Sequence, residues 1–204
     1  GSIIVVGLTL SVDLPITPGA VQPMSMASFF SGSDAFVARL SGDGSTLLGS
    51  TYLGGRLTDD ARDVAIGPGN RIFVVGKTKS VDLPVTPGVF QPDFSGDTSS
   101  PSPPYEAFVA RLTPNLDVLE YLTYLGGSAA EDGGFDIAVD SAGVAVVAGR
   151  TSSAFFPFTK GALFEQKASS MTPSSAVSTP PARGCSIRRT SVAPRRKWTT
   201  KRSP

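Results

Sequence analysis

The segment Ser11-Val-Asp-Leu-Pro-Ile-Thr-Pro-Gly-Ala-Val-Gln-Pro23 returns as Ser80-Val-Asp-Leu-Pro-Val-Thr-Pro-Gly-Val-Phe-Gln-Pro92, with ten of the thirteen positions identical. Two shorter segments repeat 72 residues apart. They are Asp34-Ala-Phe-Val-Ala-Arg-Leu40, which returns as Glu106 to Leu112, and Thr51-Tyr-Leu-Gly-Gly55, which returns as Thr123 to Gly127. Self-similarity at a fixed period is the signature of a repeat protein whose units cover one another. The chain therefore consists of repeats of about 70 residues.

Each full repeat contains four short runs rich in Val, Ile, Leu and Phe, separated by clusters of Gly, Pro, Asp or Ser, which is typical of strands joined by turns. In the complete copy the predicted strands are 63–66, 71–77, 107–112 and 119–125. The run Ile72-Phe-Val-Val75 is apolar on both sides, because successive strand residues point to opposite faces. A sheet with two apolar faces indicates face-to-face stacking, as between the blades of a propeller.

The fold class predicted from these repeats is all-β, a partial β-propeller of four-stranded antiparallel blades. The repeat region spans 1–166 and divides into a partial blade (2–58), a full blade (59–130) and a second partial blade (131–165). Val74 and Val146 should be buried in consecutive second strands, with Phe36 and Phe108 at matching sites in the third strands. Because the sequence opens inside a predicted strand, we expect a fragment of about two and a half blades from a longer protein.

The combined motifs, from the Val-Val-Gly strand through Ser-x-Asp-Leu-Pro-x-Thr-Pro-Gly to Tyr-Leu-Gly-Gly, resemble the bacterial β-propeller repeat called SBBP. The resemblance covers roughly Ile3 to Leu163. It implies one blade per repeat within a large exported or cell-surface bacterial protein, hence an extracellular or cell-surface location, and it carries over no catalytic residues. The partners it implies are further blades of the parent protein or self-association, with a protein or carbohydrate ligand that the sequence does not identify.

Composition excludes several kinds of chemistry. The chain has no histidine, which removes Ser-His-Asp triads, Cys-His dyads and histidine metal sites. Its lone cysteine, Cys185, has no partner for an internal disulfide or a thiolate cluster. No apolar run approaches the roughly 18 residues of a membrane-spanning helix. We therefore expect no cofactor, no membrane span and no catalytic residue of these kinds.

Two acidic clusters occupy equivalent places after each Leu-Gly-Gly. Such repeated carboxylates could bind Ca²⁺, which takes six to eight oxygen ligands. They could also accept backbone N–H groups in the turn between two blades, and this interpretation is favoured because the spacing matches neither an EF-hand nor a nonapeptide calcium motif. A glycoside-hydrolase pair is disfavoured, because a motif present in every blade is scaffold rather than a unique active site. The low-priority calcium candidates are Asp59, Asp60, Asp63, Glu131, Asp132 and Asp136.

The last 38 residues, 167–204, differ in composition from the rest. They hold nine Lys or Arg and no acidic residue, whereas residues 1–166 hold nine basic and seventeen acidic residues. Three interpretations stay open: an arm that binds nucleic acid non-specifically through phosphates, a disordered terminus, and translation of a shifted reading frame. The repeat pattern stops in mid-blade, and this favours the shifted reading frame.

The sequence favours a non-catalytic scaffold or interaction module of an exported bacterial protein. An enzyme should carry one unrepeated polar constellation, whereas the polar motifs here are repeat-equivalent. Tyr52 and Tyr124, with Phe36 and Phe108, are likewise expected to pack within blades rather than form a ligand platform. The alternative is part of a propeller enzyme acting on carbohydrate or peptide, with its catalytic residues outside this fragment.

Overall fold

The computed structural model describes residues 1–27, 32–128, 131–162 and 176–179, the last as backbone only. Every sheet is antiparallel, and these residues contain a 3-10 turn (η2, Pro68–Asn70) but no α-helix, so no described helix could cross a membrane. The all-β prediction is confirmed. The strands are β1 (Ser2–Thr9), β2 (Asp34–Ser41), β3 (Leu47–Leu53), β4 (Asp59–Ile66), β5 (Ile72–Thr78), β6 (Glu106–Leu112), β7 (Leu119–Leu125), β8 (Asp132–Val139), β9 (Ala145–Thr151) and β10 (Ala176–Thr179).

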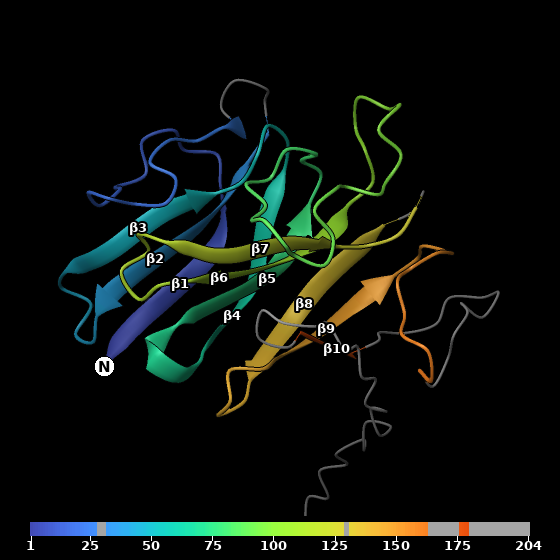
Figure 1. Ribbon diagram of the computed structural model, residues 1–204. Coiled ribbons are helices and arrows are strands. Elements are labelled where there is room, and N and C mark those ends of the chain that lie inside the picture. The colour runs from blue at the N-terminus through green and yellow to red at the C-terminus, as the bar shows by residue number, and fades with distance from the viewer. Residues whose placement is uncertain (28–31, 129–130, 163–175, 180–204) are drawn as a thin grey trace, which may run out of the picture.

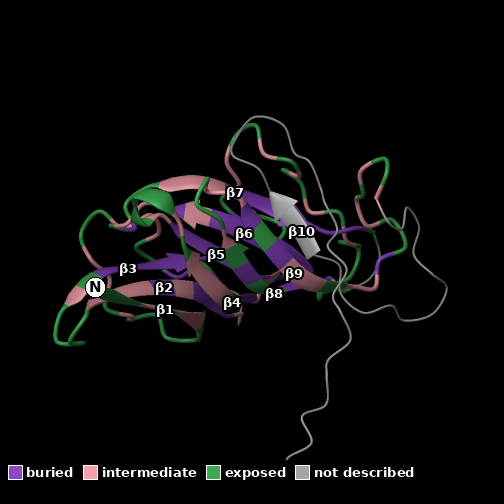
Figure 2. Cartoon of the chain, turned by 90° about the horizontal axis from the view of Figure 1, so that it is seen from below, coloured by how far each residue is buried: buried purple, intermediate pink, exposed green. Residues whose placement is uncertain are grey.

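The strands form three sheets that lie one beside the next along the molecule (Figure 1). The first sheet has the order β1-β2-β3, the middle sheet β4-β5-β6-β7 and the third sheet β8-β9-β10. Buried residues concentrate in the middle sheet (Figure 2). One of its faces shares a core with the first sheet, through Val74 and Val37, and the other shares a core with the third sheet, through Val75 and Val147.

The predicted strand 72–75 is confirmed as buried on both faces. Ile72, Phe73, Val74 and Val75 are each at most 1% exposed. Their side chains alternate between the two cores, as strand geometry requires. Burial of both faces explains why this run shows no polar alternation.

The expectation for Val146 is wrong by one residue. Gly76 stands opposite Ala61 on β4, and Gly149 stands opposite Gly134 on β8, so the equivalent of Val74 is Val147. Val147 is 2% exposed, whereas Val146 lies on the other face of β9 and is 39% exposed. A one-residue difference in alignment moves a strand residue to the opposite face.

The first strand of the complete copy begins earlier than the predicted residue 63, at Asp59 in β4, and β8 begins at the equivalent residue, Asp132. Both strands carry a β-bulge at the same place, at Arg62 and at Phe135, where the register shifts by one residue. The strand beginning was missed because its acidic residues are rare in strands. Here their side chains are used in hydrogen bonds, described below.

Phe36 and Phe108 occupy matching sites in the third strands, as predicted. Phe36 stands opposite Gly7 and Tyr52, and Phe108 opposite Gly76 and Tyr124. A Cβ added at Gly76 would lie 2.7 Å from the Phe108 ring, so glycine is what makes room for it. Phe108 is 1% exposed between the first and middle sheets, whereas Phe36 lies on the outer face of the first sheet and is half-buried.

Polar contacts also join the first sheet to the β6–β7 turn. Arg39 Nη1 donates to the Pro114 carbonyl at 2.8 Å, and the Val21 N–H donates to the Leu116 carbonyl at 2.9 Å. Leu116 has a left-handed backbone (φ 59°) at the position where the preceding repeat has Gly44 (φ 73°). This conformation costs a leucine roughly 1 kcal/mol. Full burial of its side chain against the first sheet offsets that cost.

Part of the predicted C-terminal tail forms a strand. β10 pairs with β9 with Ala176 opposite Ala148, which is the side of β9 where the middle sheet has β6 beside β5. The tail prediction for 167–204 otherwise lies outside the described residues, as does Cys185. A strand therefore occupies the third-strand place although the third-strand motif is absent from that part of the sequence.

Replacing Phe108 by Ala should destabilise the fold by about 3–5 kcal/mol, because it empties a buried ring site. The matched variant Phe36→Ala should cost clearly less, since its ring is half-buried on an outer face. Urea denaturation of both variants measures the difference. Equal losses of unfolding free energy in the two variants would contradict the placement of the middle sheet between the other two.

Candidate functional site

The Asp59 carboxylate lies at the junction between the first and middle sheets and is fully buried. Its Oδ2 accepts the Gly55 N–H at 2.7 Å and the Ser80 hydroxyl at 2.9 Å, and its Oδ1 accepts the Thr78 hydroxyl. One side chain thereby joins the Leu-Gly-Gly turn, the end of β5 and the Ser-Val-Asp-Leu-Pro loop. This is the turn-capping role that the sequence favoured.

Asp132 repeats this arrangement at the junction between the middle and third sheets. Its Oδ2 accepts the Gly127 N–H at 2.8 Å and the Ser153 hydroxyl at 2.7 Å. Strand register makes Asp132 the equivalent of Asp59, because each stands opposite a threonine, Thr151 or Thr78. The glycine and serine bonds are therefore built twice. Oδ1 differs between the junctions: in Asp59 it accepts the Thr78 hydroxyl, whereas in Asp132 it has no hydrogen-bond partner within the described part of the chain.

Each junction contains a second buried acid that the sequence did not single out. Asp34 begins β2 and Glu106 begins β6, and both are 0% exposed. A Cβ added at Gly54 would lie 2.2 Å from Asp34 Oδ1 and 2.6 Å from Asp59 Oδ2, so that glycine allows both carboxylates to approach. Gly126 plays the same part beside Glu106. The signal was present in the sequence as an acid at the start of each Ala-Phe-Val-Ala-Arg-Leu segment.

Burial controls the protonation of these acids. Loss of water around Asp59 raises its pKa to about 6, although its three hydrogen-bond donors act in the opposite direction. Burial also raises the pKa of Asp34 and of Glu106. Oδ1 of Asp34 has no hydrogen-bond partner within the described part of the chain. Asp59 therefore keeps its proton to a higher pH than an exposed aspartate does.

Asp63 and Asp136 meet each other instead of joining the junctions. Asp63 Oδ2 accepts the Ile137 N–H at 2.8 Å, which connects β4 to β8 across the two sheets. A hydrogen bond with the Asp63 carboxyl raises the pKa of Asp136. These two acids, each just after a bulge, tie neighbouring first strands together.

The remaining two candidates are separate from both groups. Asp60 forms an ion pair with Arg62 at 2.5 Å. Glu131 is exposed, and its carbonyl accepts the Ser152 N–H at 3.0 Å. The register places Gly133, not an acid, at the equivalent of Asp60. The six candidates thus do not form two equivalent clusters.

No group of three or more Asp, Glu, His or Cys side chains is placed to hold a metal ion among the residues that the structure describes. The carboxylates meet in pairs, and their oxygens accept hydrogen bonds from glycine N–H groups and from hydroxyls. A calcium ion needs six to eight oxygens. The geometry therefore favours capping over calcium binding.

The other repeated polar residues are also used in internal bonds. The Tyr52 hydroxyl donates to the Ser11 carbonyl at 2.9 Å, and the Tyr124 hydroxyl donates to the Ser80 carbonyl at 2.8 Å. Gln22 and Gln91 each accept the first N–H of the following Gly-Gly at 3.0 Å. The repeated sequence motifs thus hold each proline-rich loop onto its own sheet.

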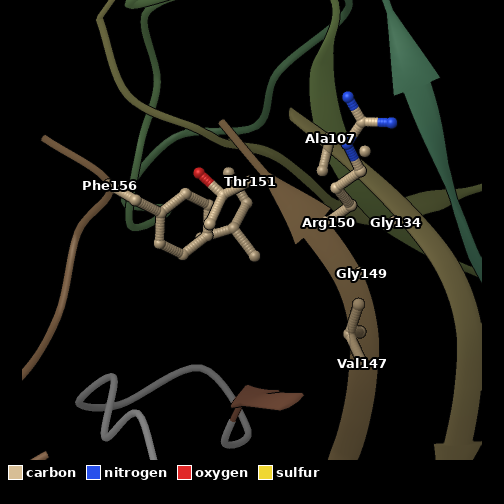
Figure 3. Close-up of a pocket in the computed structure, with 9 residues that line it drawn as sticks. Ala107, Gly134, Val147, Gly149, Arg150, Thr151 and Phe156 are labelled. Atoms are coloured by element: carbon tan, nitrogen blue, oxygen red, sulfur yellow. The ribbon is translucent and has the colours of Figure 1, made fainter. Parts of the chain in front are cut away.

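A hollow of about 290 Å³, including the open space at its mouth, lies between the middle and third sheets (Figure 3). Val147, Gly149 and Thr151 follow one another along β9, and Phe156 enters from the segment after that strand. The sequence gave no sign of it, because it depends on how two sheets meet. The lining residues are Ala107, Leu125, Gly133, Gly134, Val147, Gly149, Arg150, Thr151 and Phe156.

No protein-family model matches this chain, and no curated protein matches its sequence. The resemblance to SBBP repeats stays a prediction from the motifs.

The free energy of unfolding should rise as the pH is lowered from 7 to 5. An acid whose pKa is higher in the folded state (about 6 for Asp59) than its ordinary value of 3.8 binds more protons when folded, so lowering the pH through this window stabilises the fold. Asp59→Asn should reduce this dependence, leaving the part due to Asp34 and Glu106. Urea denaturation at pH 7, 6 and 5 measures it.

Asp43→Asn is the matched control. Hydrogen bonds from Ser41 and Ser45 lower the pKa of Asp43 to about 2, so its contribution changes only below about pH 4. This variant should keep the parent's slope between pH 7 and 5. If the pH dependence of the unfolding free energy is the same in Asp59→Asn as in the parent, the attribution of this dependence to Asp59 is wrong.

Millimolar Ca²⁺ should leave the melting temperature unchanged, because the carboxylates are capped and paired. A calcium site at 100 times its dissociation constant would add about 2.7 kcal/mol, which thermal denaturation detects easily. Melting curves with Ca²⁺ and with EDTA provide the comparison. A calcium-dependent rise that Asp59→Asn removes would reverse this conclusion.

Proposed function

We propose that this chain is a non-catalytic scaffold or interaction module, built of β-propeller blades of the SBBP type and belonging to an exported bacterial protein. Support for blades comes from the repeated stacking: the first sheet packs on the middle sheet as the middle sheet packs on the third. The first strands β4 and β8 also contact each other, which places them on the same side of the stack. Neighbouring first strands meet in this way around a propeller axis.

The observation that carries the proposal is the outer face of the first sheet. Pairing with third-strand residues makes Ile3 the equivalent of Ile72 and Val5 the equivalent of Val74. Ile3 and Val5 are 43% and 38% exposed, whereas Ile72 and Val74 are 1% and 0% exposed. The same positions are thus covered by a neighbouring sheet in one case and open in the other. This face is suited to receive another blade.

A scaffold role also accounts for the polar residues. The repeated acids, tyrosines and glutamines bond to the chain's own backbone and hydroxyls, as described above. The proline-rich loops 10–24 and 79–105 contain no strand and lie at the edges of the sheets. Loops of this kind on a rigid scaffold are where partners bind. A protein or carbohydrate ligand at these loops is the partner class we propose.

Produced alone, the chain should self-associate through the outer face of the first sheet, because exposed apolar patches favour contact. Val5→Asp should weaken that association about a hundredfold or more, since a buried carboxylate without a partner is costly. Val118→Asp is the control, because Val118 is 51% exposed on the β6–β7 turn, away from this face. Sedimentation velocity over a concentration series measures both. A parent chain that stays monomeric at all concentrations would contradict the proposal. Equal effects of the two variants on association would contradict it as well.

A further inference from the structure

The first sheet lacks, among the described residues, the strand that begins each of the other two sheets. β4 pairs with β5 and β8 pairs with β9, whereas within this part of the chain β1 pairs with β2 alone and lies at the edge of its sheet (Figure 1). Register makes β1 the counterpart of β5, because Gly7 and Gly76 each stand opposite the phenylalanine of a third strand. The outer edge of β1 is therefore the place of a first strand.

A pair of hydroxyl groups at the end of β1 has a counterpart that binds a carboxylate. In the middle sheet the Thr78 and Ser80 hydroxyls donate to Asp59, the first residue of β4. Strand register makes Thr9 the equivalent of Thr78, and Ser11 is then the equivalent of Ser80. The Ser11 N–H donates to Thr9 Oγ1 at 3.0 Å, and the same bond in the middle sheet is 2.8 Å long. The Thr9–Ser11 hydroxyl pair is therefore arranged like the pair that binds Asp59.

The backbone beside this hydroxyl pair is held by the same tyrosine bonds as in the middle sheet. The Tyr52 hydroxyl donates to the Ser11 carbonyl at 2.9 Å and accepts the Leu14 N–H at 3.0 Å. Tyr124 makes the two equivalent bonds in the next proline-rich loop. The serine thus has its place before any acid reaches it.

The described residues supply no acid to the Thr9–Ser11 hydroxyl pair. Within this part of the chain, no carboxylate bonds to the hydroxyl of Thr9 or of Ser11. Thr9 is half-buried and Ser11 is exposed, whereas the equivalent threonine and serine of the middle sheet are each 0% exposed. In the third sheet the Ser153 hydroxyl donates to Asp132 at 2.7 Å. Both sheets that contain a first strand thus bring its first residue, an aspartate, to this position.

We propose that the outer edge of β1 and the Thr9–Ser11 hydroxyl pair form a binding site for an extended peptide segment that begins with an aspartate. The segment adds beside β1 as an antiparallel first strand, and its aspartate accepts the two hydroxyls. The proposal rests on the repeat equivalence used for the proposed function. Backbone hydrogen bonds along the edge provide affinity. The carboxylate fixes the register, because a shift by one residue would move it away from its donors.

The chemistry of the segment follows from what β4 and β8 share. Each has an aspartate at its first and fifth positions and an alanine between two branched residues at its end. The fifth position also has a donor beside β1. Asp63 accepts the Ile137 N–H, and register makes the Val64 N–H of β4 the equivalent donor for a segment on β1. The second position is free to vary, since β4 has Asp60 where β8 has Gly133.

The test uses a fluorescent peptide with the sequence of residues 59–66, Asp-Asp-Ala-Arg-Asp-Val-Ala-Ile, titrated with the full chain. Saturable binding is expected. The peptide carrying Asp59→Ala should bind about tenfold or more weakly, because it loses the hydrogen bonds from two hydroxyls to a charged group. The peptide carrying Asp60→Ala is the matched control. It has the same change of charge and should keep the affinity of the parent peptide.

Variants of the chain test whether the hydroxyl pair is what the aspartate meets. Thr9→Val combined with Ser11→Ala should weaken binding of the parent peptide about as much as Asp59→Ala does. On this variant chain the Asp59→Ala peptide should lose no further affinity, because the two changes remove the same interaction. Ser100→Ala, on an exposed loop, is the control and should leave the affinity unchanged.

Hydrogen exchange on the unsubstituted chain gives a result that does not depend on a variant folding. Bound peptide should protect the amides of β1. Absence of binding, equal affinity of the Asp59→Ala and Asp60→Ala peptides, additive effects of the peptide and chain changes, or protection confined to strands other than β1 would each overturn the proposal. Self-association of the parent chain is measured without peptide. A chain that associates but does not bind the peptide contradicts this site and leaves the proposed blade contact standing.

Discussion

The middle sheet has two apolar faces, and the rest of the structure depends on covering both. Its central strand β5 alternates its side chains between two cores, so neither face can remain in water without exposing large aliphatic residues. One neighbouring sheet lies on each side, and each neighbour is left with one covered face and one open face. This explains why exposure in Figure 2 increases from the middle of the stack toward its ends.

Stacked apolar faces can slide, and the buried acids at the sheet junctions restrict that movement. Asp59 and Asp132 each bond to a glycine N–H and a serine hydroxyl from separate segments. Such bonds are directional, and leaving one unmade in a buried place is costly. The carboxylates therefore set the position of each turn relative to the next sheet, while the aliphatic cores supply most of the stabilising free energy.

Much of this architecture was predictable from the repeats. Strand positions, the two-faced burial of 72–75 and the matching of Phe36 with Phe108 follow from periodicity and spacing. Three features did not follow. Val146 was placed on the wrong face, because one extra residue between Gly127 and Asp132 changes the repeat offset from 72 to 73 before β8 and β9. The acids at the starts of β2 and β6 become important only when the chain folds back. The hollow depends on how the middle and third sheets meet, which no local sequence pattern records.

The extra residue between Gly127 and Asp132, compared with Gly55 and Asp59, lies wholly in the connection between sheets. Both junctions keep their carboxylate-to-glycine bond despite this difference in length. The difference in length is thus confined to the connection between two sheets, and strand pairing within each sheet is unchanged. The same connection is a candidate insertion point for grafted peptides, because the strands on either side keep the same register at both of the lengths present here.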